Sequence, residues 1–193
     1  MICESATVHP TAVIGPNVDI GEGAYIGPLC VLGAFAEHPT QYTKPKGRVV
    51  IGDGAVLTKL VTVDSPTDAI TIVGRDSYLM AHSHVGHDAV LGEGSILACG
   101  AKVGGWSSLG NFCNIGLNAV LHQKSVLADG VMVAASAFFK GNAFKMFSIY
   151  AGVPAKYIKD NSVLIQRLKD EGVLSDALVF TGKRRTRSPQ AGD

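Results

Sequence analysis

A six-residue repeat that runs unbroken from Val73 to Phe138 restricts the fold of this chain more than any other feature of its sequence. Each unit opens with an aliphatic residue, and a small residue or a valine stands four places later. The opening residues are Val73, Leu79, Val85, Leu91, Leu97, Val103, Leu109, Ile115, Leu121, Leu127 and Val133. Hexapeptide repeats are typical of parallel β-helices, whose coils stack because no single coil can bury its own apolar side chains. We therefore expect each unit to form a strand and a turn, with both repeated positions pointing inward.

The same pattern occupies residues 8–36 and resumes at Ile51, so a β-helix domain is expected over residues 1–140. Glu37–Arg48 is polar, contains two prolines and fits no unit, which predicts a loop at 37–48 ejected from the helix. Such a loop could contact a substrate or be a tolerated surface insertion. A smaller break in phase falls at Asp68–Thr71. With these breaks the chain holds about nineteen units, or a little over six coils.

Beyond Phe138 the repeat decays, and 141–148 is expected to be irregular. Residues 141–174 should form an extension with one α-helix, because Ser162–Glu171 places aliphatic residues on one stripe. Residues 175–193 include the basic run KRRTR and are expected to be disordered. This tail is either inert or binds a phosphate-rich partner.

Composition sets further limits on partners and on location. Hydrophobic residues make up 47% of the chain and charged residues 17%, which suits a filled core and a surface partly covered by other subunits, here a homotrimer. A net charge of +1 gives no sign of a nucleic-acid partner. There is no apolar run long enough for a membrane span and no signal-peptide pattern at the first residues. The four cysteines show no disulfide or metal spacing, Cys30 and Cys113 fall on inward positions, and a cytoplasmic protein is the simplest interpretation.

Four of the six histidines lie in the central units, and none of them occupies an inward position of the repeat. They are His82, His84, His87 and His122. Imidazole on an outward face, in a cleft between two subunits, can act as a general base near neutral pH. A hydroxyl or amine that attacks an acyl thioester needs such a base, together with a hydrogen-bond donor for the developing oxyanion.

The repeat resembles that of the hexapeptide acyltransferases, which implies a left-handed parallel β-helix. Leu79–Gly92 (LMAHSHVGHDAVLG) resembles the catalytic coil of the UDP-N-acetylglucosamine acyltransferases of lipid A biosynthesis. The similarity continues without a gap through Gly105 and Ala119–Gln123, and it covers roughly residues 8–140. Ala151–Lys156 resembles the closing segment of many acyl-CoA-dependent members of the superfamily.

This resemblance implies a role for several residues. It places His87 at the family's general-base position, with Asp88 beside it, and Gly105 where a backbone N–H donates to the oxyanion. The implied substrate-binding residues are His84, His122 and Gln123 in the cleft, Ala135 where the family measures acyl-chain length, and Trp106. Trp106 is also a departure, since the family has a sugar-binding histidine at this position.

Two further departures concern the acceptor. The family's nucleotide-sugar contacts should fall in the 37–48 loop, which here has a different sequence, and the family's long C-terminal helical region is reduced to about one helix. The resemblance therefore supports the family's acyl-transfer chemistry for this chain more strongly than it supports the family's acceptor. A relative that acts on another amino sugar or nucleotide sugar is as consistent with the sequence as the lipid A enzyme.

The leading hypothesis is an acyltransferase with no bound cofactor and no metal site. Its donor would be an acyl thioester of acyl carrier protein or coenzyme A, and its acceptor a hydroxyl or amine of a sugar or nucleotide sugar. A second hypothesis is a zinc enzyme that resembles the γ-class carbonic anhydrases, because His82 and His87 are five residues apart. A third is a non-catalytic β-helix scaffold, which predicts that the outward histidines are dispensable.

Overall fold

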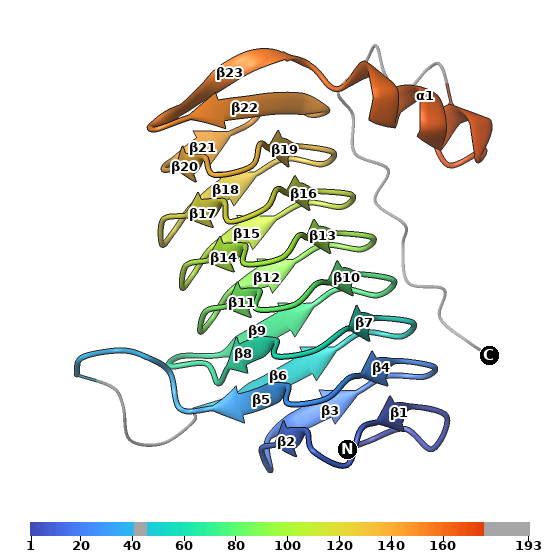
Figure 1. The fold of residues 1–193 in the computed structure, drawn as a ribbon, viewed down its shortest axis with the longest axis vertical. Coiled ribbons are helices and arrows are strands. Elements are labelled where there is room, and N and C mark those ends of the chain that lie inside the picture. The colour runs from blue at the N-terminus through green and yellow to red at the C-terminus, as the bar shows by residue number, and fades with distance from the viewer. Residues whose placement is uncertain (41–45, 176–193) are drawn as a thin grey trace, which may run out of the picture. The chain divides into compact units, whose positions relative to one another are not determined.

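In the computed structural model, residues 1–40 and 46–175 are described. The chain divides into two compact units, Met1–Asn161 and a second that starts at Ser162. The first unit is a parallel β-solenoid built from three sheets (Figure 1). The predicted tail, apart from Ser175, and the middle of the predicted 37–48 loop lie outside the described residues.

Three sheets form the sides of the solenoid, and each contains every third strand of the chain in parallel, with the antiparallel β23 added at the end of the first. The first contains β1 (Thr7–Val8), β4 (Tyr25–Ile26), β7 (Val56–Leu57), β10 (Tyr78–Leu79), β13 (Ile96–Leu97), β16 (Asn114–Ile115), β19 (Met132–Val133), β22 (Ser148–Gly152) and β23 (Ala155–Asp160). The second contains β2 (Val13–Ile14), β5 (Val31–Ala34), β8 (Thr62–Asp64), β11 (His84–Val85), β14 (Lys102–Val103), β17 (Val120–Leu121) and β20 (Phe138–Phe139). The third contains β3 (Val18–Ile20), β6 (Arg48–Ile51), β9 (Ile70–Val73), β12 (Val90–Leu91), β15 (Ser108–Leu109), β18 (Val126–Leu127) and β21 (Asn142–Ala143).

The register of the strands shows that eighteen residues close one coil in the regular part of the solenoid. Leu79 pairs with Leu97, Leu97 with Ile115, and Ile115 with Val133. Residues eighteen apart therefore lie directly above one another. Any side chain on one coil is placed beside its counterpart on the next.

The interior of the solenoid consists of the two repeated positions, as the sequence predicts. All eleven opening residues from Val73 to Val133 are at most 2% exposed, and so are the eleven small residues that follow them. Cys30 and Cys113 belong to this core, and burial raises the pKa of the Cys113 thiol to about 12. The parallel β-helix predicted from the repeat is confirmed.

The corners of the coils share one backbone conformation. Every sixth residue from Asp76 to Ser136 has a positive φ, between 53° and 73°. Only Gly94, Gly100 and Gly130 among these eleven positions are glycines, which have no steric penalty there. The other eight carry side chains in the left-handed region, so stacking of the coils imposes this turn against the local preference of most residues.

The solenoid continues further along the chain than the repeat suggests. β20 keeps the six-residue phase, β21 pairs with β18 across a shorter unit, and β22 pairs with β19, so much of the expected irregular segment 141–148 is part of the solenoid. β23 returns antiparallel to β22 and makes a hairpin at one end of the stack (Figure 1). The six-residue pattern does not detect this last part of the solenoid, because its units are shorter and because large side chains such as Phe139 replace the aliphatic opening residues.

The second unit contains the predicted helix, α1 (Ser162–Asp170). It ends at Gly172, whose φ of 70° and whose N–H bond to the Lys169 carbonyl oxygen are typical of a glycine after a helix C-terminus. Within the described residues, no helix combines the length and the apolar character needed to cross a bilayer.

Candidate active site

The predicted site residues gather at the corner that follows the second sheet. His87, Gly105 and Gln123 are eighteen residues apart and stack on successive coils after β11, β14 and β17. Gly86, Gly104 and His122 form a second ladder beside them. Together with Glu37, Asp64 and His84, these two ladders line an open groove of about 440 Å³.

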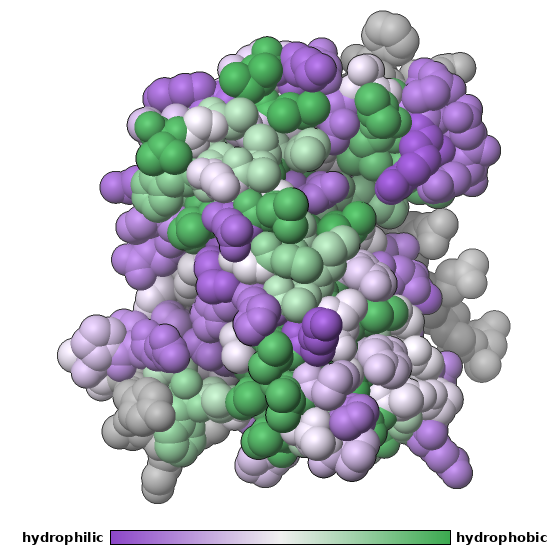
Figure 2. Space-filling model, viewed as in Figure 1, coloured by the Kyte–Doolittle hydropathy of each residue, from purple (hydrophilic) through white to green (hydrophobic). Residues whose placement is uncertain are grey.

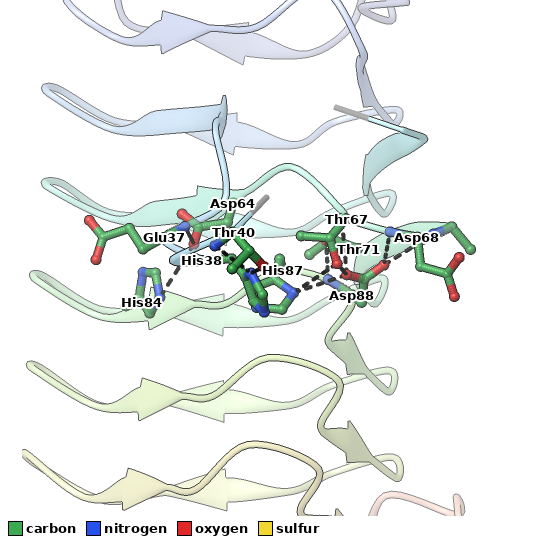
Figure 3. A network of polar contacts seen from close by, with 11 residues as sticks. Glu37, His38, Thr40, Asp64, Thr67, Asp68, Thr71, His84, His87 and Asp88 are labelled. Carbon is green, nitrogen blue, oxygen red and sulfur yellow. Dashed lines mark hydrogen bonds and ion pairs between the residues drawn. The ribbon is translucent and has the colours of Figure 1, made fainter. Parts of the chain in front are cut away.

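His87 is fixed by the carboxylate of its neighbour. Its Nδ1 lies 3.0 Å from Asp88 Oδ2, and Thr67 Oγ1 lies 3.5 Å from the same nitrogen. Asp88 in turn accepts hydrogen bonds from the Thr67 hydroxyl at 2.7 Å and from the backbone N–H groups of Thr67, Asp68 and Ala69 at 2.8–3.1 Å (Figure 3). The second break in the repeat is therefore a loop whose amides surround one carboxylate.

This arrangement favours the ionised form of Asp88 and selects the tautomer of His87. Burial by itself would raise the pKa of Asp88, but the hydrogen bonds from His87, Thr67 and Ala69 outweigh it and lower the pKa from 3.8 to about 2. An ionised carboxylate only accepts hydrogen bonds, so His87 Nδ1 must be the donor. The neutral imidazole then carries its lone pair on Nε2.

Nε2 of His87 faces the backbone of Gly105 on the next coil. A Cβ atom built on Gly105 would lie 2.6 Å from Nε2, so a side chain at this position would displace the imidazole. Among the described residues, no group accepts a hydrogen bond from the Gly105 N–H. The groove thus combines a bare imidazole nitrogen with a neighbouring free N–H donor.

Two further side chains, Trp106 and His38, cover the imidazole of His87. Trp106 packs edge-on against it with ring centroids 4.3 Å apart, and His38 lies 5.5 Å away. The Lys124 ammonium sits 5.3 Å from the centre of the Trp106 ring. His87 points out of its coil as predicted, yet it is only 6% exposed, because these residues and Thr67 enclose it. An outward position in the repeat therefore does not leave this side chain exposed.

A second histidine–carboxylate pair lies in the same groove. His84 Nδ1 is 2.8 Å from Thr62 Oγ1, and His84 Nε2 is 3.8 Å from Asp64 Oδ2. Asp64 is only 5% exposed, and burial raises its pKa, although His84 and the Glu37 N–H partly offset this. Figure 3 shows Asp64 and His84 on one side of His87 and Asp88 on the other.

The structure brings together all but two of the residues that the sequence singled out. His87, Asp88, Gly105, His84, Trp106, His122 and Gln123 belong to this corner or line its groove. Ala135 does not, since it is exposed at the corner after β19, which belongs to the first sheet. His82, needed for the zinc hypothesis, is also exposed, and no three metal-ligating side chains converge within residues 1–40 and 46–175.

Sequence reasoning missed Asp64, Thr67 and His38. Asp64 and Thr67 follow Val63 at the start of a break in phase, and His38 belongs to the polar loop after β5. Both irregularities are visible in the sequence. The pattern does not show that the polar loop after β5 and the break after β8 both pack against His87.

Comparison with known proteins agrees with this architecture. The family model described as bacterial transferase hexapeptide (six repeats) matches residues 1–34 and 70–105. The acyl-[acyl-carrier-protein]–UDP-N-acetylglucosamine O-acyltransferase of Campylobacter concisus is 29% identical over 147 residues, or 68% of this chain and 56% of the relative. The carnitine operon protein CaiE of a Proteus species is 32% identical over 163 residues, covering 82% of this chain and 66% of that protein.

Among solved structures, the UDP-N-acetylglucosamine acyltransferase of Campylobacter jejuni superposes with a TM-score of 0.73 at 25% identity. The superposition covers 89% of this chain and 80% of that one. The chain spans little more than half the length of the Campylobacter concisus relative. These likenesses establish the kind of fold and the superfamily, while the substrate has to be argued from the groove.

Proposed function

Because the chain belongs to the hexapeptide-repeat transferase superfamily, we propose that it is an acyltransferase that uses the groove around His87 as its active site. The donor is an acyl thioester of acyl carrier protein or coenzyme A. The acceptor is a hydroxyl or an amine of a sugar or nucleotide sugar. The Campylobacter concisus relative, which is named for acyl carrier protein and UDP-N-acetylglucosamine, supports this choice of substrate classes.

The observation that carries the proposal is the orientation of His87. Its Nδ1–H is committed to ionised Asp88 at 3.0 Å, so Nε2 is free to accept a proton from the nucleophile. The nucleophile then attacks the thioester carbonyl carbon, and the Gly105 N–H donates to the oxygen as it becomes negative. Collapse of this intermediate breaks the C–S bond, and the leaving thiolate takes the proton back from His87.

The proposal includes a homotrimer in which a neighbouring subunit covers the groove. The described solenoid exposes several large apolar side chains, and Figure 2 shows hydrophobic areas between hydrophilic ones on one face. These side chains include Val13, Leu29, Leu117 and Phe144. Burying such side chains between copies would remove them from water. A monomer mass by light scattering at micromolar concentration would exclude this assembly.

The test of the proposed function is His87→Gln, assayed by thiol release from acetyl-coenzyme A and acyl carrier protein thioesters with a panel of sugars and nucleotide sugars. Glutamine keeps an N–H toward Asp88 and fills the enclosed space, but it cannot act as a base. We expect turnover to fall by roughly 10²–10⁴, the usual contribution of a positioned base.

The matched control is His82→Asn in the same coil. His82 is exposed and has a φ of 61°, a conformation that asparagine tolerates. The activity of the His82→Asn variant should therefore stay at the wild-type level. Full activity of a folded His87→Gln protein would defeat the proposal. That result would favour the scaffold hypothesis, in which the outward histidines are dispensable.

A further inference from the structure

One charged side chain in the groove has no part in the chemistry described above. Asp64 lines the groove, is 5% exposed, and has its Oδ2 near His84 Nε2 at 3.8 Å and the Glu37 N–H at 3.4 Å. Within the described residues, no group donates a hydrogen bond to its other oxygen, Oδ1. Oδ1 is not among the described buried side-chain atoms left without a partner, so it is open to the groove, where a cationic donor of a bound molecule can reach it.

The charges around Asp64 point the same way. Glu37 brings a second carboxylate to the rim of the groove, and among the described residues no lysine or arginine lines it. Lys124, a nearby cation, has its ammonium over the Trp106 ring. His84 is the side chain that faces Asp64 Oδ2, and its Nδ1 is occupied by Thr62. The groove beside His87 is therefore built to attract positive charge rather than a phosphate.

We propose that Asp64 binds an ammonium group of the acceptor and that this enzyme acylates an amine rather than a hydroxyl. The inference rests on the proposed acyltransferase function and narrows its acceptor to amino sugars or amino-substituted nucleotide sugars. Burial raises the pKa of Asp64, and a bound ammonium would compensate the buried charge. Asp64 is thus a specificity residue, while His87 remains the base.

The reaction balances without a further reactant. The bound ammonium loses one proton to water through the open groove, which leaves a lone pair on nitrogen. That lone pair forms the new C–N bond while His87 Nε2 takes a second proton. The carbonyl electron pair moves onto oxygen beside the Gly105 N–H and returns as the C–S bond breaks. The thiolate is protonated by His87, so the products are an amide and a free thiol.

The experiment compares matched acceptors that differ in one atom. UDP-N-acetylglucosamine is paired with analogues in which each ring hydroxyl in turn is replaced by an amine, and free glucose is paired with its amino sugars. Binding is measured by calorimetry without a donor, and acyl transfer is measured separately with both thioesters. We expect one amino analogue to bind the wild type roughly 10–100-fold more tightly than its hydroxyl partner, the usual size of a hydrogen bond between charged groups.

Asp64→Asn keeps the shape of the side chain and removes its charge. It should erase the preference for the amine while the hydroxyl partner binds as before. Asp76→Asn is the matched control, because Asp76 is an exposed aspartate that does not line the groove and should contribute little. The preference of the wild type is itself a test that does not depend on the stability of the variant.

The remaining outcomes separate this inference from the proposed function. Transfer to a hydroxyl that depends on His87, with no preference for the amine, would overturn the amine subsite and leave the acyltransferase standing. An amine preference lost in Asp64→Asn, without acyl transfer to any acceptor, would support the subsite and contradict the acyltransferase. Binding of neither member of any pair, or a preference that survives in Asp64→Asn, would overturn the inference.

Discussion

Two corners of the solenoid share the same backbone conformation but differ in what their side chains do. At the corner after the third sheet, the position two residues past the opener is occupied by Glu93, Asn111 and Asp129 on successive coils. The N–H of Glu93 is bound by Asn111 Oδ1 and the N–H of Asn111 by Asp129 Oδ1, both at 2.9 Å. At the corner after the second sheet, the equivalent positions are His87, Gly105 and Gln123.

The second of these ladders lacks the short amide and carboxylate side chains of the first. Glycine at 105 cannot reach the N–H of His87, and Gln123 makes no such bond to Gly105 among the described residues. The backbone N–H groups that are bound by side chains at the corner after the third sheet therefore stay free at the corner after the second sheet. The two corners therefore differ in whether their side chains accept hydrogen bonds from the backbone N–H groups of the neighbouring coil. They do not differ in the path of the backbone.

Among the substitutions that test this contrast between the corners, Gly105→Ala at the site corner is expected to have the largest effect. A Cβ atom at this position would lie 2.6 Å from His87 Nε2 and 2.7 Å from its Cε1, so the imidazole must move. A displacement of about 1 Å at a catalytic group typically costs about 10² in rate. We expect a loss of that order in thiol release, with Ser108→Ala on an exposed outward position as the unaffected control. Wild-type turnover in Gly105→Ala would show that His87 does not need this space.

A smaller effect, on stability, is expected from Asp88→Asn. The lowering of the Asp88 pKa from 3.8 to about 2 corresponds to about 2 kcal/mol of folding free energy at neutral pH. Because the pKa is lower in the folded protein, this stability is present above about pH 4 and is lost as the pH falls toward 2. Urea unfolding across this range should show the loss in wild type and a flatter curve in Asp88→Asn.

Asp76→Asn is the matched control for this variant. Asp76 occupies the same turn position as Asp88, with a φ of 53°, but it is exposed, and its carboxylate forms an ion pair with Arg75 at 3.6 Å. Its removal should leave the acid dependence of unfolding nearly unchanged. Equal curves for the two variants would mean that the amides of the 67–69 loop do not hold a charged carboxylate.

The smallest effect is expected at the structural corner from Asn111→Ala. The change removes the acceptor for the Glu93 N–H and makes this corner resemble the site corner. We expect a loss of about 0.5–1 kcal/mol in the free energy of unfolding, since the bond is exposed. Gln123→Ala, at the equivalent site position, should cost less. If Gln123→Ala is the more destabilising of the two, the contrast between the corners fails.

Much of this site could be predicted because its members are related by the repeat. His87, Gly105 and Gln123 differ by eighteen residues, so any coil of three units stacks them. His87 and Asp88 are neighbours in sequence, and their contact needs only the turn that every coil makes. Trp106 follows Gly105 and is carried to the same corner. The resemblance assigned roles to these residues, and the period brought them together.

The residues that the sequence did not predict lie where the repeat changes phase. Thr67 and Ala69 surround Asp88 because the extra residues between β8 and β9 fold back over the corner. His38 packs against the imidazole of His87 from the start of the loop after β5. No period relates residue 38 to 67 or 87, so their meeting depends on the paths of two irregular segments. For the same reason the burial of His87 was not foreseen.

The sequence by itself determined the interior of this protein, its coil length and the outward ladders of the site. Those features follow from a local rule, in which every sixth side chain is buried because each coil covers the next. Only the tertiary structure decided that the two breaks in that rule converge, enclose His87 and bury Asp64 in the groove. A repeat fixes what is the same in every coil, whereas contacts between departures from the repeat exist only once the whole stack has formed.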